Sequence, residues 1–172
     1  MATVVALLRG VNVGGRKVSM AELRELIESL GYSDARTYIQ SGNVIFKSAR
    51  KPASSALESA IEERFGLAVD VMLRTPAELK RALERDPFQS ADRSSVHVGF
   101  MARAAKTATV RAIDASSFEP EEFAVVGSEL YLHLPNGLGR SKLPDFVLRR
   151  LKIPTTLRNW RTVAKLAELA SE

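Results

Sequence analysis

The chain has 172 residues, of which 45% are apolar and 26% are charged, a composition that is ordinary for a folded globular protein and argues against intrinsic disorder. It contains no cysteine, which excludes disulfides, thiolate metal sites and cysteine nucleophiles and favours a reducing compartment. No apolar run approaches the roughly 18 to 20 residues that a membrane span needs. The first apolar run, residues 2–8, lacks a basic leader and is interrupted by Arg9, so we expect a cytoplasmic protein without a membrane partner.

The formal net charge of +5 is concentrated toward the C-terminus. Residues 1–135 hold 17 basic and 17 acidic side chains, whereas residues 136–165 hold eight basic side chains against Asp145 alone. This excess indicates an anionic partner, although a net charge of this size can also serve solubility alone. A row of basic residues at i, i+3 and i+7 on a predicted helix could follow a phosphate backbone, or could form a solvated helix face. The candidate contacts are Arg158, Asn159, Arg161 and Lys165.

Residues 1–74 predict the element order βαββαβ. Residues 3–8 are aliphatic on both alternating faces, which is typical of a central strand covered on both sides. A capping box at Ser19 and Glu22 predicts the start of a helix. Strands at 36–40 and 43–47 joined by a tight turn, a second helix and a strand at 68–73 follow. This is the split-βαβ order of ferredoxin-like folds.

Residues 75–94 predict a helix, opened by a capping box at Thr75 and Glu78, and then a polar linker. The pattern begins again in residues 95–151, with a strand, a helix at 104–112, a hairpin and another helix. We interpret this region as a second, less complete ferredoxin-like half. Residues 152–172 form a C-terminal segment with an amphipathic helix from about Leu157. The predicted fold class is therefore α+β, with two ferredoxin-like (α/β-plait) halves and a C-terminal helix.

The glycine-rich loop between the first strand and the first helix is the main candidate binding site. Its glycines permit positive φ, so successive N–H groups could surround an anion, and a helix N-terminus and basic side chains add positive charge. The loop fails both nucleotide fingerprints, because GxGxxG is absent and Arg16 and Lys17 occupy the lysine and Ser/Thr positions of a P-loop. A packing turn with solvated charges is the alternative. The predicted ligand-binding residues here are Arg9, Asn12, Gly14, Gly15, Arg16 and Lys17.

Residues 40–43 form a second polar cluster, and Ser41 and Asn43 join the predicted ligand-binding residues. A simple hairpin turn is the alternative interpretation. This turn and the end of the first strand could lie at opposite ends of a plait sheet, so the sequence does not assign the cluster to the glycine-rich loop.

The two histidines lie in predicted strands of the second half. His97, Tyr131 and His133 could share one sheet face, at the positions where RNA-recognition sheets stack bases, or could form a half-buried domain contact. Two isolated histidines without further ligands do not indicate a metal site, and we expect no cofactor.

Three motifs stand in order along the chain: LLRGVNVGG at residues 7–15, TYIQSGNVIF at 37–46 and RNWRTV at 158–163. Together they resemble the signatures of DUF1697, a bacterial family of unknown function. The resemblance implies an α+β fold of two ferredoxin-like parts and carries no activity or catalytic residue with it. Many signature positions are polar and lie on predicted loops, which favours a binding site.

Three functions remain open. The first is a binding protein for a phosphate-bearing small molecule or nucleic acid at residues 9–17. The second is an enzyme that acts on a small anionic substrate without a metal, with Arg9, Asn12 or Asn43 placing an oxygen. The third is a structural or self-assembling protein, so that the chain could be a monomer or a homodimer.

Overall fold

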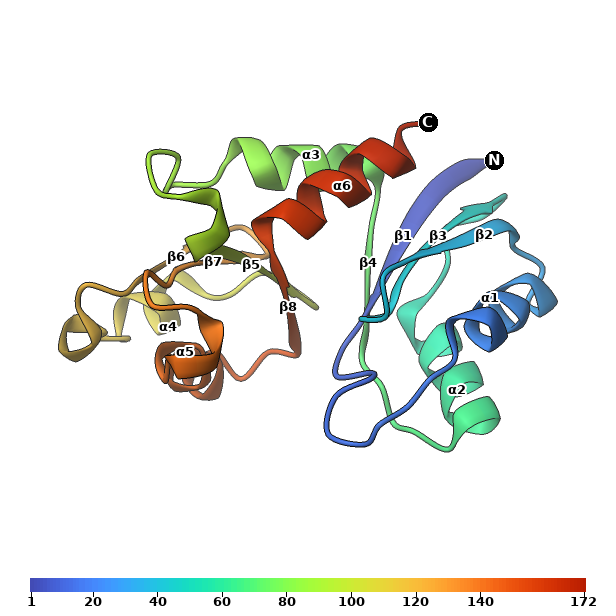
Figure 1. The fold of residues 1–172 in the computed structure, drawn as a ribbon, viewed down its shortest axis with the longest axis horizontal. Coiled ribbons are helices and arrows are strands. Elements are labelled where there is room, and N and C mark those ends of the chain that lie inside the picture. Colours follow the sequence, from blue (N-terminus) through green and yellow to red (C-terminus); the bar gives the residue numbers. More distant parts are fainter. The chain divides into compact units, whose positions relative to one another are not determined.

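The structure is a computed structural model that describes residues 1–172. It consists of two compact units (Figure 1). The first unit comprises residues 1–79 together with residues 166–172, and the second comprises residues 80–165. None of the helices has the length and apolar character that crossing a membrane requires.

The first unit is a four-stranded antiparallel sheet with two helices on one face (Figure 1). The strand order is β2-β3-β1-β4, which is the order of a ferredoxin-like fold and confirms the βαββαβ prediction. Its elements are β1 (Ala2–Leu8), α1 (Met20–Ser29), β2 (Ser33–Tyr38), β3 (Asn43–Ser48), α2 (Ser54–Phe65) and β4 (Val71–Arg74), followed by α3 (Pro76–Glu84).

Strand β1 lies inside this sheet, between β3 and β4. Val4, Ala6 and Leu8 point toward α1 and α2 and belong to the core between sheet and helices. Val5 and Leu7 point to the other face and are fully buried as well. The aliphatic residues on both faces of this strand are therefore explained by its central position.

The two predicted capping boxes differ in the structure. At α3 the box is complete, because Thr75 Oγ1 accepts from the Glu78 N–H (3.1 Å) and Glu78 Oε2 accepts from the Thr75 N–H (2.8 Å). At α1 only half of it forms: Ser19 Oγ accepts from the Glu22 N–H (3.3 Å), but the Glu22 carboxylate accepts instead from Arg64 of α2 (2.9 Å).

The second unit repeats the same architecture, with strand order β6-β7-β5-β8 and antiparallel pairing throughout. Helices α4 and α5 cover one face, over a core that includes Leu130, Leu132 and Val147. The elements are β5 (Val96–Met101), α4 (Thr107–Arg111), β6 (Glu122–Val126), β7 (Glu129–His133), α5 (Leu143–Leu151) and β8 (Thr155–Asn159), with short 3-10 turns at Arg93–Ser95, Ser116–Phe118 and Leu138–Arg140. Helix α6 (Trp160–Ala170) begins in this unit, and its residues from Leu166 on belong to the first unit.

Strand β8 is the main difference from the sequence prediction. Helix was expected from about Leu157, but residues 155–159 pair with β5 as an edge strand and helix α6 begins only at Trp160. Asn159 marks the boundary, since its Oδ1 accepts from the Thr162 N–H (2.8 Å) as a helix N-cap. The second half is thus a complete ferredoxin-like unit that continues past residue 151. The helix predicted at 104–112 is shorter than expected, at Thr107–Arg111.

Candidate functional site

The glycine-rich loop and the turn at residues 39–42 lie at the same end of the first sheet. Strand β1 runs antiparallel to β3, with Leu7 opposite Asn43, and the Leu8 N–H donates to Gly42 O (2.9 Å). The approach is so close that a Cβ on Gly42 would lie 2.6 Å from Val11 Cγ2, and φ at Gly42 is +83°. The two polar clusters predicted from sequence are therefore brought together, which the sequence left open.

The tip of the glycine-rich loop is a small hairpin. The Asn12 N–H donates to Arg16 O (2.6 Å), the Arg16 N–H donates to Val13 O (3.0 Å), and φ is 55° at Gly14 and 82° at Gly15. Positive φ at both central residues is characteristic of a type I′ turn, which explains the paired glycines. The N–H groups of Gly14 and Gly15 donate no hydrogen bond within the protein and are exposed.

Asn12 fastens the base of this hairpin. Its Oδ1 accepts from the Val18 N–H (2.9 Å) and its Nδ2 donates to Val18 O (3.1 Å) and to Gln40 O. The side-chain amide therefore uses both its acceptor and its donors inside the protein. These bonds join the loop to the turn after β2. The amide of Asn12 therefore positions these two segments.

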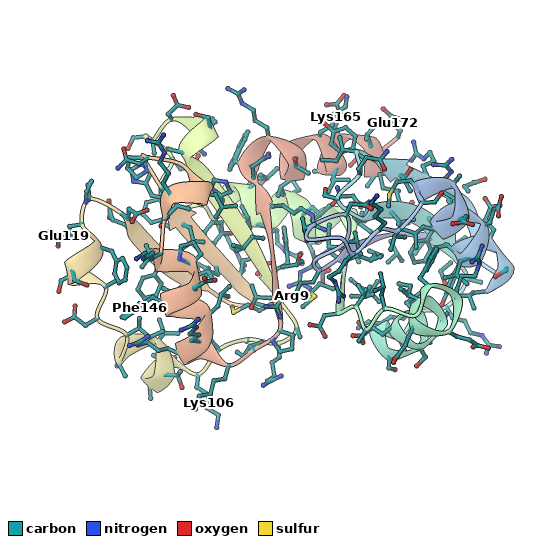
Figure 2. All side chains as sticks on the ribbon, turned by 60° about the horizontal axis from the view of Figure 1, so that its bottom comes forward. Arg9, Lys106, Glu119, Phe146, Lys165 and Glu172 are labelled. Carbon is teal, nitrogen blue, oxygen red and sulfur yellow. The ribbon has the colours of Figure 1, made fainter.

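The two arginines of the loop are also engaged. Arg16 Nε donates to Gly10 O (3.0 Å) and its Nη2 donates to Ala68 O (2.6 Å), which ties the loop to the segment before β4. Arg9, labelled in Figure 2, forms an ion pair with Asp70 at 3.4 Å, and both side chains are about half exposed. Such an exposed pair contributes little to stability and leaves Arg9 accessible.

The turn after β2 holds one strained residue. Ile39 has φ of 52°, a left-handed conformation that a β-branched residue rarely adopts, and its side chain is 49% exposed. Strain of this kind concentrates at functional sites and is maintained by surrounding contacts. Asn43 maintains this turn: it is fully buried, and its Nδ2 donates to Tyr38 O (3.0 Å) and to Ser41 Oγ (2.9 Å).

The exposed residues of this frame include Val13, Gly14, Gly15, Lys17 and Ile39, and we call these five the tip surface. The first four lie on the hairpin, and Ile39 directly precedes the residue whose carbonyl accepts from Asn12. Sequence reasoning missed Val13 and Ile39. An aliphatic residue in a motif looks like a core residue, and only the structure shows that Val13 is 57% exposed.

Comparison with known proteins covers most of the chain. The model of a family described as protein of unknown function, DUF1697, matches residues 1–131. The chain belongs to this family. A solved structure of a conserved bacterial protein, SP0830 from Streptococcus pneumoniae, is similar over 100% of this chain and 99% of that one, with 24% identity and a TM-score of 0.78. This likeness confirms the fold. No curated protein matches the chain.

The third motif of this DUF1697 chain does not form the predicted basic helix face. Arg158 lies in β8, is 8% exposed and donates to Thr156 Oγ1 (2.7 Å) and Leu157 O (3.0 Å). Burial lowers the pKa of its guanidinium to about 10. Asn159 is exposed, but its side-chain oxygen caps α6, whereas Arg161 is exposed and Lys165 is partly buried. The three basic residues at i, i+3 and i+7 do not form one helix face, because the first of them, Arg158, lies in strand β8.

The RNA-recognition arrangement of the histidines is wrong for this DUF1697 protein. His97 pairs with Leu132, whereas Tyr131 pairs with Val98. Directly paired residues share a sheet face, so His97 lies on the opposite face from Tyr131 and His133. Tyr131 is fully buried and donates to Ala82 O (2.5 Å), and its ring is therefore not available for stacking on a base. Side chains able to ligate a metal nowhere gather in groups of three or more.

Proposed function

We propose that this DUF1697 protein binds a phosphate-bearing or other anionic ligand at the tip surface. Two unoccupied backbone N–H groups, those of Gly14 and Gly15, and the ammonium group of Lys17 are the groups that the ligand would use. Backbone N–H groups in glycine turns and lysine side chains are common anion-binding groups in proteins. Arg9 adds a second accessible positive charge at the base of the loop.

The observation that carries the proposal is the rigid frame behind an exposed tip. Asn12 and Arg16 fix the hairpin through side-chain bonds to residues 10, 18, 40 and 68. A loop that is already ordered loses little conformational entropy when a ligand binds. In this proposal Asn12, Arg16, Ser41 and Asn43 position the site, and Lys17 and the two glycines contact the ligand. Exposed Val13 and Ile39 add apolar contact area beside the anion.

Titration of the protein with inorganic phosphate, followed through backbone amide resonances, tests this assignment. We expect the resonances of Gly14 and Gly15 to shift in a saturable way, and the affinity for phosphate to be lower in Lys17→Ala than in wild type. Lys47→Ala, on the surface of β3, is the matched control and keeps the wild-type affinity. The proposal fails if phosphate and a panel of nucleotides leave both glycine resonances unmoved at low salt.

A second candidate function is binding of nucleic acid by the second unit. This unit holds 15 basic and nine acidic side chains, whereas the first holds ten and eleven, so the whole positive excess lies in the second unit. Part of this positive charge lies at the end of α5, where Arg149, Arg150 and Lys152 are exposed. Arg103 lies beside them and donates to Lys152 O (3.5 Å). The guanidinium carbon Cζ of Arg150 also lies 3.5 Å from the ring centroid of Phe146, which is labelled in Figure 2.

The salt dependence of oligonucleotide binding tests this second candidate. For every phosphate group that a variant no longer neutralises, the slope of log affinity against log salt should become shallower by about 0.7 to 0.9. The triple variant Arg149→Ala, Arg150→Ala, Lys152→Ala should therefore bind more weakly and with a shallower slope than wild type. An unchanged slope, or the same loss in Lys80→Ala on α3, would exclude the end of α5 as the binding surface.

A further inference from the structure

A cavity of about 400 Å³ lies in the first unit at the other end of β1, away from the glycine-rich loop. The start of β1, the end of β3, the loop at residues 49–53, the end of β4 and the start of α3 meet around it. Its volume falls within the roughly 300 to 1,000 Å³ of pockets that hold small molecules. Neither the predicted ligand-binding residues nor the tip surface contributes to it.

The floor of this cavity is apolar. Val4 of β1 and Pro52 of the 49–53 loop are buried, and Leu73 of β4 is partly buried. Beside an inorganic ion, the carbon atoms that remain accessible in this lining would stay in contact with water, whereas an organic molecule with an apolar part would cover them. Removing apolar surface from water is favourable. The floor therefore favours an organic ligand.

The rim of the cavity is predominantly positive. Arg50 and Lys51 are exposed side chains of the 49–53 loop, and Arg74 stands at the end of β4. Glu78 is the acidic residue of the lining, and its carboxylate is turned to the start of α3, where it accepts from the Thr75 N–H. The two exposed cations of the 49–53 loop, on the side of the rim away from Glu78, make that side suited to an anion.

The segment that carries two of these cations is fixed in place. Ser48, only 4% exposed, accepts from the Arg50 N–H (3.3 Å) and donates to Arg50 O. This pair of bonds closes a tight turn immediately after β3. Pro52 restricts the backbone on the other side of Lys51. Arg50 and Lys51 are thus presented from an ordered backbone and lose less conformational freedom on binding than they would on a flexible loop.

From this floor and rim we propose that the cavity is a second binding site, specific for a small organic anion that has an apolar body and one terminal carboxylate or phosphate. The apolar body lies over Val4, Pro52 and Leu73. The anionic group is held at the rim by Arg50 and Lys51. The site does not depend on the glycine-rich loop, and either site can be absent without the other.

A series of compounds with the same alkyl chain and different head groups tests the proposal on the intact protein. Amide resonances of residues 2, 49 and 51 report on this cavity, and those of Gly14 and Gly15 report on the tip surface. We expect hexanoate or hexyl phosphate to shift the first set, and their relative affinity shows which head group the rim prefers. Hexanol should bind more weakly, and hexylamine and inorganic phosphate should not saturate the site.

Variants of the rim complete the test. Arg50→Gln combined with Lys51→Gln should weaken the alkyl anion about tenfold or more, because charged hydrogen bonds are lost. It should leave hexanol binding unchanged, which shows that the cavity is still formed. Lys47→Gln, on β3 outside the lining, is the control. Equal binding of hexylamine and hexanoate, no shift with any compound, or full affinity in the double variant would overturn the proposal.

Discussion

The side-chain amide of Asn12 donates to the backbone carbonyl of Gln40, and this bond joins the glycine-rich loop to the turn after β2. Asn12 also closes its own loop through two bonds to Val18 and has φ of 57°. Asparagine is one of the few residues with a Cβ that adopts this conformation readily. The residue therefore combines a backbone requirement with a side-chain requirement.

Replacing Asn12 should separate these two requirements. Asn12→Gly keeps the positive φ and loses the amide, so it should lower the free energy of unfolding by about 2 kcal/mol, from the lost hydrogen bonds. Asn12→Ala loses the amide and must also adopt a disfavoured φ, so it should cost about 1 kcal/mol more. Urea unfolding measures both values. Equal stability of Asn12→Gly and wild type would show that the bonds to Val18 and Gln40 contribute nothing.

Gly42 and Gly14 provide a matched pair for the glycine-rich end of the sheet. Both have positive φ, but a Cβ on Gly14 would meet no atom within 4 Å, whereas one on Gly42 would lie 2.6 Å from Val11 and 2.8 Å from Leu8. Gly14→Ala should cost about 1 to 2 kcal/mol from backbone conformation alone. Gly42→Ala should cost clearly more, because the strands must also separate. Thermal unfolding of both variants gives the comparison, and similar costs would contradict the close approach.

His97 should make the stability of the second unit depend on pH. Burial lowers the pKa of His97 below its ordinary value of 6.5, and its Nδ1 has no hydrogen-bond partner. The unfolded chain therefore binds a proton at a higher pH than the folded chain does. As the pH falls below about 6.5, the free energy of unfolding should decrease until the folded-state pKa is reached.

His97→Leu removes this titration and should flatten the decrease between about pH 7 and pH 5. Urea unfolding at several pH values measures the slope. His133, the other histidine of the chain, is present in both proteins and cancels in the comparison. A slope that is identical in wild type and variant would show that His97 titrates alike in the folded and unfolded states.

Asp86 and Arg93 form a close ion pair in the second unit, at 2.6 Å, with the Asp86 carboxylate fully buried. Arg93→Met leaves that carboxylate without its cation and should cost about 3 kcal/mol. Adding Asp86→Asn to this variant removes the unpaired charge while keeping an oxygen that can accept from the Phe88 N–H. The second substitution should therefore restore stability in the Arg93→Met background and reduce it in wild type. Additive effects in this double-mutant cycle would contradict a coupled pair.

Local signals in the sequence were sufficient for much of the fold. The capping box at Thr75 and Glu78 involves residues three apart, so its full geometry could be predicted from the sequence. The aliphatic residues on both faces of β1 likewise indicated its central place in the sheet. In the box at Ser19, the carboxylate of Glu22 bonds to Arg64 instead, which is 42 residues away and invisible to a local pattern.

The candidate site was harder to predict because the bonds that hold it are long-range. Arg16 looks like an anion-binding residue next to a glycine pair, but Ala68 O, its partner, is 52 residues away. Arg158 looks like the first residue of a basic helix face, because its strand is only five residues long and ends directly at a helix. In both cases a polar residue of a motif makes hydrogen bonds that stabilise the fold. Its neighbours in the sequence resemble those of a ligand-binding residue, so the sequence alone does not separate the two roles.

The composition of the first unit has a consequence for synthesis. Its sheet and helices come from residues 1–79, but residues 166–172 belong to it as well, and Arg36 of β2 donates to Leu169 O (3.0 Å). On the ribosome, the segment that completes the first unit is made only after the whole of the second. Domains usually fold in the order in which they emerge. Here β2 of the first unit lacks its bond to Leu169 until translation has passed the last strand of the second.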